Sequence, residues 1–297
     1  MILVSAFKKY FALDDKQKEF IKTGNRIFMT RPAELLKFLQ PLAKFDQECD
    51  AARGQAGKIM LGCFLLGILL IFLLAAEVLP QMLAPVLLVP AFVFVLTLVA
   101  YLILKSVDIH NNLREFVVPV LNTISQDMEP NEKIRVKIDL RGKCIAAKKL
   151  RTEKNDPGWF SYPKTTKNFY KDVWFDGSAN LYDGSRLFFS VTDMVTHTHV
   201  YKKNRRGNKV KSKNKYKIKS VIKTGLALKN KDYVIQESAE LTGAGDRVKQ
   251  KQGNRRNVIS LTRVELSNSL ETALEPVSML ALIGKILMSA RPAAKQE

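Results

Sequence analysis

The chain has 297 residues, of which 46% are hydrophobic, and a formal net charge of +20 at pH 7. Its three cysteines, Cys49, Cys63 and Cys144, form an odd set without motif spacing, which excludes a disulfide framework and a cysteine zinc site. No P-loop, Gly-x-Gly-x-x-Gly, His-Glu-x-x-His or Gly-x-Ser-x-Gly motif is present, so we expect neither an enzyme nor a cofactor or metal site.

Residues 1–57 are predicted to form a helical N-terminal segment. Between residues 33 and 52, apolar residues recur at three- and four-residue spacing, which makes one helical stripe. Pro41 predicts a kink or a break in this helix. The earlier stretch from Ile2 to Phe28 mixes aromatic residues with lysines, which fits a helix lying on an anionic inner leaflet, or a helix packed on the C-terminal domain, which we favour. The stripe consists of Leu35, Leu36, Leu39, Leu42 and Phe45.

Two uncharged apolar runs, 59–76 and 82–104, follow this segment. A bilayer core of about 30 Å is crossed by roughly 20 helical residues, so each run is long enough to span it. Both runs lie too far from the N-terminus to be a signal peptide. We therefore predict a transmembrane hairpin over 58–105, with spans at 59–77 and 82–104.

Charges around the hairpin predict its orientation. Every lysine or arginine near the spans lies before residue 59 or after residue 104, and the connection 77–81 has none. Basic residues near span ends favour the cytoplasmic side of a membrane. The sequence therefore predicts a multi-pass protein of the inner or plasma membrane with both termini in the cytoplasm.

The region after the hairpin changes its hydrophobic period. Residues 106–130 are predicted to form a juxtamembrane helix, perturbed by Pro119. From residue 132 the pattern alternates with a period of two, which predicts a β-rich domain over 131–266. Residues 267–297 are predicted to be a C-terminal helix and tail. Strands are expected at 134–140, 169–175, 179–182, 186–201, 212–228, 233–236 and 258–266.

Turn and loop signals separate these strands. Asp176-Gly177-Ser178 and Asp183-Gly184 are predicted turns, whereas 152–167 and 241–256 are predicted loops. Short intervals between turns favour a small sandwich or a partly open barrel. The expected fold is thus an α+β membrane protein, in which a two-helix transmembrane hairpin carries a cytoplasmic, mainly antiparallel β domain with flanking helices.

Six lysines occupy every second position from 209 to 219, which is the most specific chemical pattern in the chain. On a strand, alternate residues share a face and stand about 7 Å apart, so one face would carry six ammonium groups. Residues 194–231 contain thirteen Lys or Arg and no Asp or Glu. The candidate anion- or partner-binding residues are Arg205, Arg206, Lys209, Lys211, Lys213, Lys215, Lys217 and Lys219.

A hairpin between 186–201 and 212–228 is the expected setting of this lysine ladder, with Arg205-Arg206-Gly207-Asn208 at its tip. In the expected register, Asp193 neutralises Lys219 across the ladder, and the lysines face outward. The pairs in this register are 193 with 219, 195 with 217, and 197 with 215.

The sequence leaves three interpretations of the lysine ladder open. The first is a solvated face that also discourages edge-to-edge pairing of strands. The second is contact with anionic lipid headgroups, because the hairpin would hold the domain near the inner leaflet. The third is contact with nucleic acid or an acidic protein. Phosphate contact needs only positive charge, but single-strand binding also needs aromatic rings, and Tyr201 and Tyr216 are the local candidates.

These patterns predict a non-enzymatic binding or scaffolding module that presents a basic β-hairpin at the cytoplasmic face of a membrane. The alternative is a subunit of an oligomeric membrane channel or transport complex. The expected partners are the lipid bilayer itself, with anionic headgroups, an acidic protein and further copies of the chain as candidates. Nucleic acid stays among the candidates although no nucleic-acid motif accompanies the ladder.

Overall fold

The computed structural model describes residues 2–76, 78, 80–156, 158, 162–203, 209–235, 245–270, 272 and 274–292. It divides the chain into two compact units. The helical unit comprises Met1–Thr23 and Phe38–Arg114, and the sheet unit comprises Gly24–Lys37 and Glu115–Glu297.

Four helices build most of the helical unit. The predicted stripe is buried at Leu39, Leu42 and Phe45, and the ring of Tyr10 lies 5.7 Å from the ring of Phe45. The expected break at Pro41 is wrong, because the helix continues through it; the side chains buried on both sides of Pro41 offset its lost hydrogen bond. The helices are α1 (Ile2–Ala12), α2 (Asp15–Thr23), α3 (Pro32–Ala75) and α4 (Leu88–Ser106).

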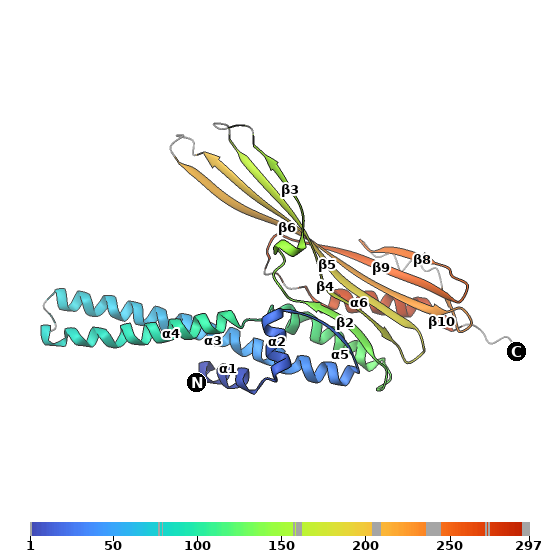
Figure 1. Ribbon diagram of the computed structural model, residues 1–297, viewed down its shortest axis with the longest axis horizontal. Helices are drawn as coiled ribbons and strands as arrows, with labels where there is room; N and C mark the ends of the chain where they lie inside the picture. The colour runs from blue at the N-terminus through green and yellow to red at the C-terminus, as the bar shows by residue number, and fades with distance from the viewer. Residues whose placement is uncertain are drawn as a thin grey trace. The chain divides into compact units, whose positions relative to one another are not determined.

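Both apolar runs are helical, and α3 and α4 lie antiparallel and side by side (Figure 1). A 3-10 turn, Gln81–Leu87, leads into α4. In the most apolar 18-residue stretches of α3 and α4, 0% and 11% of the residues are buried. The apolar side chains of the two helices therefore do not pack into a protein core. Arg53 and Asp108 form an ion pair of 2.6 Å, which links the middle of α3 to the residues just after α4. The chain thus has two candidate membrane spans in a hairpin.

One open antiparallel sheet forms the sheet unit, in the order β1-β2-β4-β5-β6-β9-β8, with β3 paired to β4. In the part of the chain that the structure describes, this sheet neither closes into a barrel nor stacks on a second sheet of similar size. A separate two-stranded ribbon pairs β7 (Tyr233–Ile235) with β10 (Ala290–Pro292). The strands of the large sheet are β1 (Asn25–Thr30), β2 (Ile134–Asp139), β3 (Lys149–Asn155), β4 (Lys164–Asn180), β5 (Arg186–Lys203), β6 (Val210–Lys229), β8 (Arg247–Lys251) and β9 (Arg256–Ser267).

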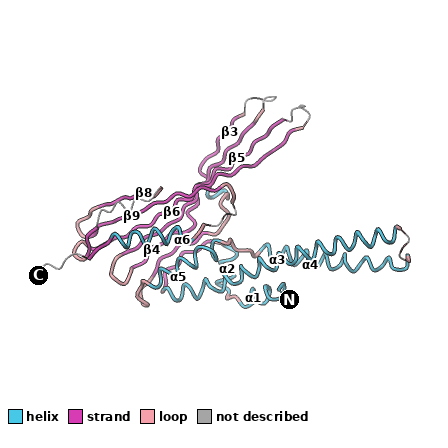
Figure 2. Tube along the Cα trace, turned by 180° about the vertical axis from the view of Figure 1, so that it is seen from behind, coloured by secondary structure: helices cyan, strands magenta, loops and turns pink. Residues whose placement is uncertain are grey.

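Helices cover one face of this sheet (Figures 1 and 2). They are α5 (Val118–Gln126), which follows a π-helical turn at Leu113–Val117, and α6 (Pro276–Ser289). The juxtamembrane helix is shorter than expected, since residues 107–111 are not helical. Beneath the helices, the ring of Phe116 lies 5.2 Å from that of Trp174. Among the described residues of the sheet unit, no helix covers the other face of the sheet.

Three strands and one supposed turn differ from the expectation. β1 was expected to be helical, most of β3 falls in the predicted loop 152–167, and β8 falls in the predicted loop 241–256, whereas all three are paired strands. The predicted turn at Asp176–Ser178 is wrong, because these residues lie inside β4. A Cβ on Gly177 would stand 2.6 Å from the ring of Phe189 and 2.7 Å from the carbonyl oxygen of Arg135. The glycine therefore serves close packing between strands instead of a turn.

Four strands extend beyond the rest of the sheet as an arm (Figure 1). The arm consists of β3 with the adjoining stretches of β4, β5 and β6, namely 149–155, 164–172, 193–203 and 210–219. Over residues 210–217, β6 is an edge strand, because its pairing with β9 begins at Ile218. The predicted lysine ladder therefore lies on the arm.

A candidate anion-binding face

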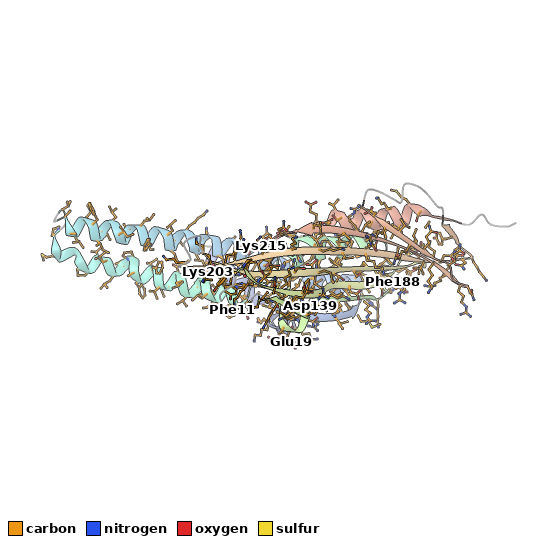
Figure 3. The ribbon with its side chains drawn as sticks, turned by 90° about the horizontal axis from the view of Figure 1, so that it is seen from above. Phe11, Glu19, Asp139, Phe188, Lys203 and Lys215 are labelled. Atoms are coloured by element: carbon orange, nitrogen blue, oxygen red, sulfur yellow. The ribbon has the colours of Figure 1, made fainter. Side chains whose placement is uncertain are left out.

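The lysine ladder is exposed along one strand. All six lysines, from Lys209 to Lys219, are exposed, and five of them alternate along β6 on the same face. Lys209 directly precedes the strand. Figure 3 labels Lys203 and Lys215 on the arm, and Phe188 toward the opposite end of β5. The predicted tip residues Arg205 and Arg206 lie outside the described residues.

The pairing partners of the ladder are shifted by one residue from the expected register. Met194 lies opposite Lys219, and Thr198 lies opposite Lys215. A shift of one residue exchanges the two faces of a strand. Asp193 is therefore on the face opposite the lysines, fully buried, and the prediction that it neutralises Lys219 is wrong.

The positive face continues beyond the arm. On β6 the same alternation reaches Lys223, and on β4 Lys167 and Lys171 lie on this face, two strands away from the ladder. Among the described strand residues, Glu153 and Asp176 are its exposed acids. We call this surface the basic face. It comprises Lys211, Lys213, Lys215, Lys217, Lys219, Lys223, Lys167, Lys171, Arg135, Lys137, Arg186, Arg247, Lys249 and Lys251.

Charge is concentrated at the distal end of the arm. A hollow of about 460 Å³ there is lined by Lys202, Lys203 and three lysines of the ladder. No acid lines this hollow in the described part of the chain. Like charges held this close favour the approach of an anion, and the hollow allows the anion to contact several ammonium groups at once.

Histidine and tyrosine side chains occupy the other face of the arm. The ring of His197 stacks on that of Tyr216 at 4.5 Å, and His199 contacts Tyr201 at 4.4 Å. Both histidines hydrogen-bond to the side-chain oxygen of Asn214. The aromatic rings that single-strand recognition would use are thus separated from the ladder by the thickness of the sheet.

Aromatic rings on the basic face itself are covered. The guanidinium group of Arg151 lies 4.6 Å from the centre of the Phe169 ring, and that of Arg186 lies 5.2 Å from the centre of the Phe188 ring. An arginine in this position occupies the ring face on which a base would stack. This face therefore presents charge and not a stacking platform.

A buried ionic cluster fixes the base of the arm. Asp172 and Asp193 face each other across β4 and β5, an arrangement in which like charges repel. Lys143 pairs with Asp193 at 2.9 Å. Lys148 pairs with Asp172 at 2.7 Å and with Asp139 at 3.2 Å. Together with Arg141, which pairs with Asp139 at 2.7 Å, these two lysines match the three carboxylates in charge.

Further hydrogen bonds complete this cluster. Arg141 donates two hydrogen bonds to Asp139, at 2.9 and 2.7 Å, and Ser220 donates one of 2.7 Å to Asp193. Burial acts to raise the pKa of Asp139, but Arg141 and Lys148 outweigh it and the pKa is lowered. Burial raises the pKa of Asp172 to about 6, against the opposing effect of Lys148. The base of the arm is thus held by charges that no longer face solvent.

Several residues of the basic face were not among the predicted site residues. Arg135, Arg186 and Lys223 belong to strands whose other residues form the core. Lys223 continues the alternation of the ladder, so the sequence contained a signal for it. Arg135 and Arg186 join the face only through pairing between strands distant in sequence. Comparison with known proteins adds no assignment, because no protein-family model, curated protein or solved structure matches this chain.

Proposed function

We propose that this protein is a membrane-anchored, non-enzymatic binding module whose basic face contacts anionic lipid headgroups. The observation that carries the proposal is the single sign of charge on the lysine ladder and its continuation across the sheet. Lysines near an anionic leaflet contribute about 1 kcal/mol each, within a Debye length of about 8 Å. Several lysines held on one rigid face add their contributions without a large loss of side-chain and backbone freedom.

The membrane anchor in this proposal is the hairpin of α3 and α4. Its apolar side chains are exposed, since only 0% and 11% of the residues in the most apolar stretches of the two helices are buried. An exposed apolar surface of this extent is unfavourable in water but favourable in hydrocarbon. The absence of basic residues in the 77–81 connection places both termini on the cytoplasmic side in our proposal.

Protection of strand edges does not account for the lysine ladder. β3, the opposite edge of the arm, carries both signs, since Arg151 and Glu153 form an ion pair of 3.0 Å. The ladder carries one sign only. The basic face also extends along β6 to Lys223, where β6 pairs with β9 and is no longer an edge strand. Among polyanions, the covered aromatic rings of this face disfavour single-stranded nucleic acid.

The test uses the full chain in nanodiscs of neutral lipid, mixed with vesicles of neutral lipid or of lipid containing phosphatidylserine. Replacing Lys209, Lys211, Lys213, Lys215, Lys217 and Lys219 by Gln should weaken binding to the anionic vesicles at least about 100-fold, because six contributions of about 1 kcal/mol are removed. The matched control replaces the same six residues by Arg, which keeps the charge and should keep the binding.

The salt concentration, the charge of the lipid and a competing polyanion are varied to find results that contradict the proposal. Binding of the wild-type chain to anionic vesicles should fall as salt rises. Equal binding to neutral and anionic vesicles would remove the headgroup contact. Tighter binding to duplex DNA than to anionic vesicles at the same salt concentration would replace lipid by nucleic acid as the partner.

A further inference from the structure

A groove of about 470 Å³ lies on the basic face, away from the arm. Three cations from three strands line it: Arg135 of β2, Arg186 of β5 and Lys223 of β6. In the described part of the chain, no carboxylate forms an ion pair with any of them. Three unpaired cations around one hollow create a local site for an anion, which is separate from the lysine ladder.

The hollow results from a missing side chain. Gly225 pairs with Phe188 on one side and with Ser260 on the other, so the groove floor lies between these two side chains. A Cβ on Gly225 would contact the carbonyl oxygen of Ile259 at 3.3 Å and the Cβ of Ser260 at 3.4 Å. A glycine at this position therefore leaves space that a larger residue would fill.

One cation of the groove is already oriented. The Arg186 guanidinium lies 5.2 Å from the centre of the Phe188 ring, and its Nη2 donates a hydrogen bond of 3.2 Å to the hydroxyl oxygen of Ser178. A guanidinium held in this way keeps further N–H groups available, and their planar fork matches a phosphate group. Little rotamer freedom is left to lose when an anion binds.

Uncharged and acidic groups in the groove suit a ligand that also carries hydroxyl groups. Ser190 and Ser260 offer hydroxyls, and Asp176 offers a carboxylate acceptor. Three cations against one carboxylate leave a net positive site. A simple anion would use only the cations, whereas a phosphorylated polyol would use the cations for its phosphate group and Asp176 for a hydroxyl.

We propose that this groove binds a phosphorylated polyol of the glycerol phosphate type, either free in solution or as the headgroup of a phospholipid. The phosphate group lies among Arg135, Arg186 and Lys223, and a hydroxyl group of the carbon skeleton reaches Asp176. The site recognises one molecule with directed hydrogen bonds, whereas the lysine ladder contacts a charged surface without such bonds.

The soluble arm of the test titrates glycerol phosphate into the full chain in nanodiscs of phosphatidylcholine, with sulfate as the simple anion. We expect one glycerol phosphate per chain, bound more tightly than sulfate. Arg135→Gln together with Arg186→Gln should weaken this binding at least tenfold. The control Lys133→Gln removes an exposed cation just before β2 that does not line the groove, and it should bind as the wild type does.

The lipid arm compares nanodiscs that contain phosphatidylglycerol or phosphatidylserine at equal charge. The readout is the rate at which an amine-reactive reagent acylates Lys223, measured by mass spectrometry. We expect slower acylation with phosphatidylglycerol, and no difference between the lipids in the Arg135→Gln, Arg186→Gln variant. A response in this arm alone assigns the ligand to a lipid headgroup, and a response in the soluble arm alone assigns it to a free polyol phosphate.

Two results would overturn the assignment. One is identical behaviour of the wild type and the Arg135→Gln, Arg186→Gln variant in both arms. The other is equal affinity for sulfate and glycerol phosphate together with equal acylation in both lipids, which would leave only non-specific charge. The variant with six Gln in the ladder should retain the groove, so loss of vesicle binding there leaves this inference standing.

Discussion

Lysine has two opposite roles in the sheet unit. At the base of the arm, Lys143 and Lys148 are each 8% exposed and pair with buried carboxylates. Along the arm, the lysines of the ladder are exposed, and no ion pair involves them in the described part of the chain. The net charge of +20 therefore combines two kinds of lysine. Paired lysines hold the fold, and unpaired lysines create the field that a partner meets.

The largest effect on stability is expected at Lys148. Its ammonium contacts both Asp139 and Asp172, so Lys148→Met leaves two buried carboxylates without their shared cation. We expect a loss of about 3–5 kcal/mol in the free energy of unfolding. The measurement is denaturant unfolding of the full chain in nanodiscs, followed by near-ultraviolet circular dichroism. The control Lys149→Met changes an exposed neighbour, and a loss of similar size there would contradict the paired role.

A smaller loss is expected at Lys143. Asp193 keeps the hydrogen bond from Ser220 when its lysine is removed, so Lys143→Met should cost about 3 kcal/mol, at the lower end for a broken buried pair. Combining it with Asp193→Leu should restore most of the loss, because both charges are then absent. If the double variant is less stable than the single variant, the pair does not act as a unit.

The pH dependence of stability distinguishes the buried cluster from the ladder. The pKa of Asp172 is raised from 3.8 to about 6 in the folded chain, so between these values the folded state binds more protons than the unfolded state. The contribution of Asp172 to stability therefore falls as pH rises from about 4 to about 6, and its full cost is present above that window. Asp172→Asn should flatten the curve there relative to the wild type, in unfolding experiments at fixed denaturant. Parallel curves would contradict the assignment.

The smallest effect on stability is expected from the lysine ladder. Exposed lysines without partners contribute little to folding, so each of the six single Lys→Gln substitutions should change the free energy of unfolding by less than about 0.5 kcal/mol. The same unfolding assay checks this. A large destabilisation would show that the ladder is part of the fold, and it would remove the contrast with Lys148.

Local patterns predicted the elements of the fold better than their partners. The two apolar runs form helices as predicted, and the alternating residues of β6 form a strand as predicted. β3 was missed because both of its faces are exposed, so its sequence has no hydrophobic alternation. β1 was missed because its burial follows from pairing with β2, more than 100 residues away along the chain.

For the lysine ladder, the sequence predicted the exposed residues but not their pairing partners. The residues of β6 alternate along the strand whichever residues of β5 they pair with. The alternation could therefore not set the register between the two strands. The partner of Asp193 is Lys143, which is distant in sequence and lies on neither strand of the hairpin. For the same reason, the groove around Gly225 could not be predicted, because its walls come from several strands.

The most direct test of the account measures the acylation of lysines in the full chain, reconstituted in nanodiscs of neutral lipid or of lipid containing phosphatidylserine. We expect the ladder residues Lys211 to Lys219 to react more slowly in the anionic discs and to recover at high salt. The exposed Lys154, which lies on the other face of the arm, serves as the internal reference and should react equally in both. Equal reactivity of the ladder in the two lipids at low salt would contradict the claim that unpaired charge on this face contacts an anionic membrane.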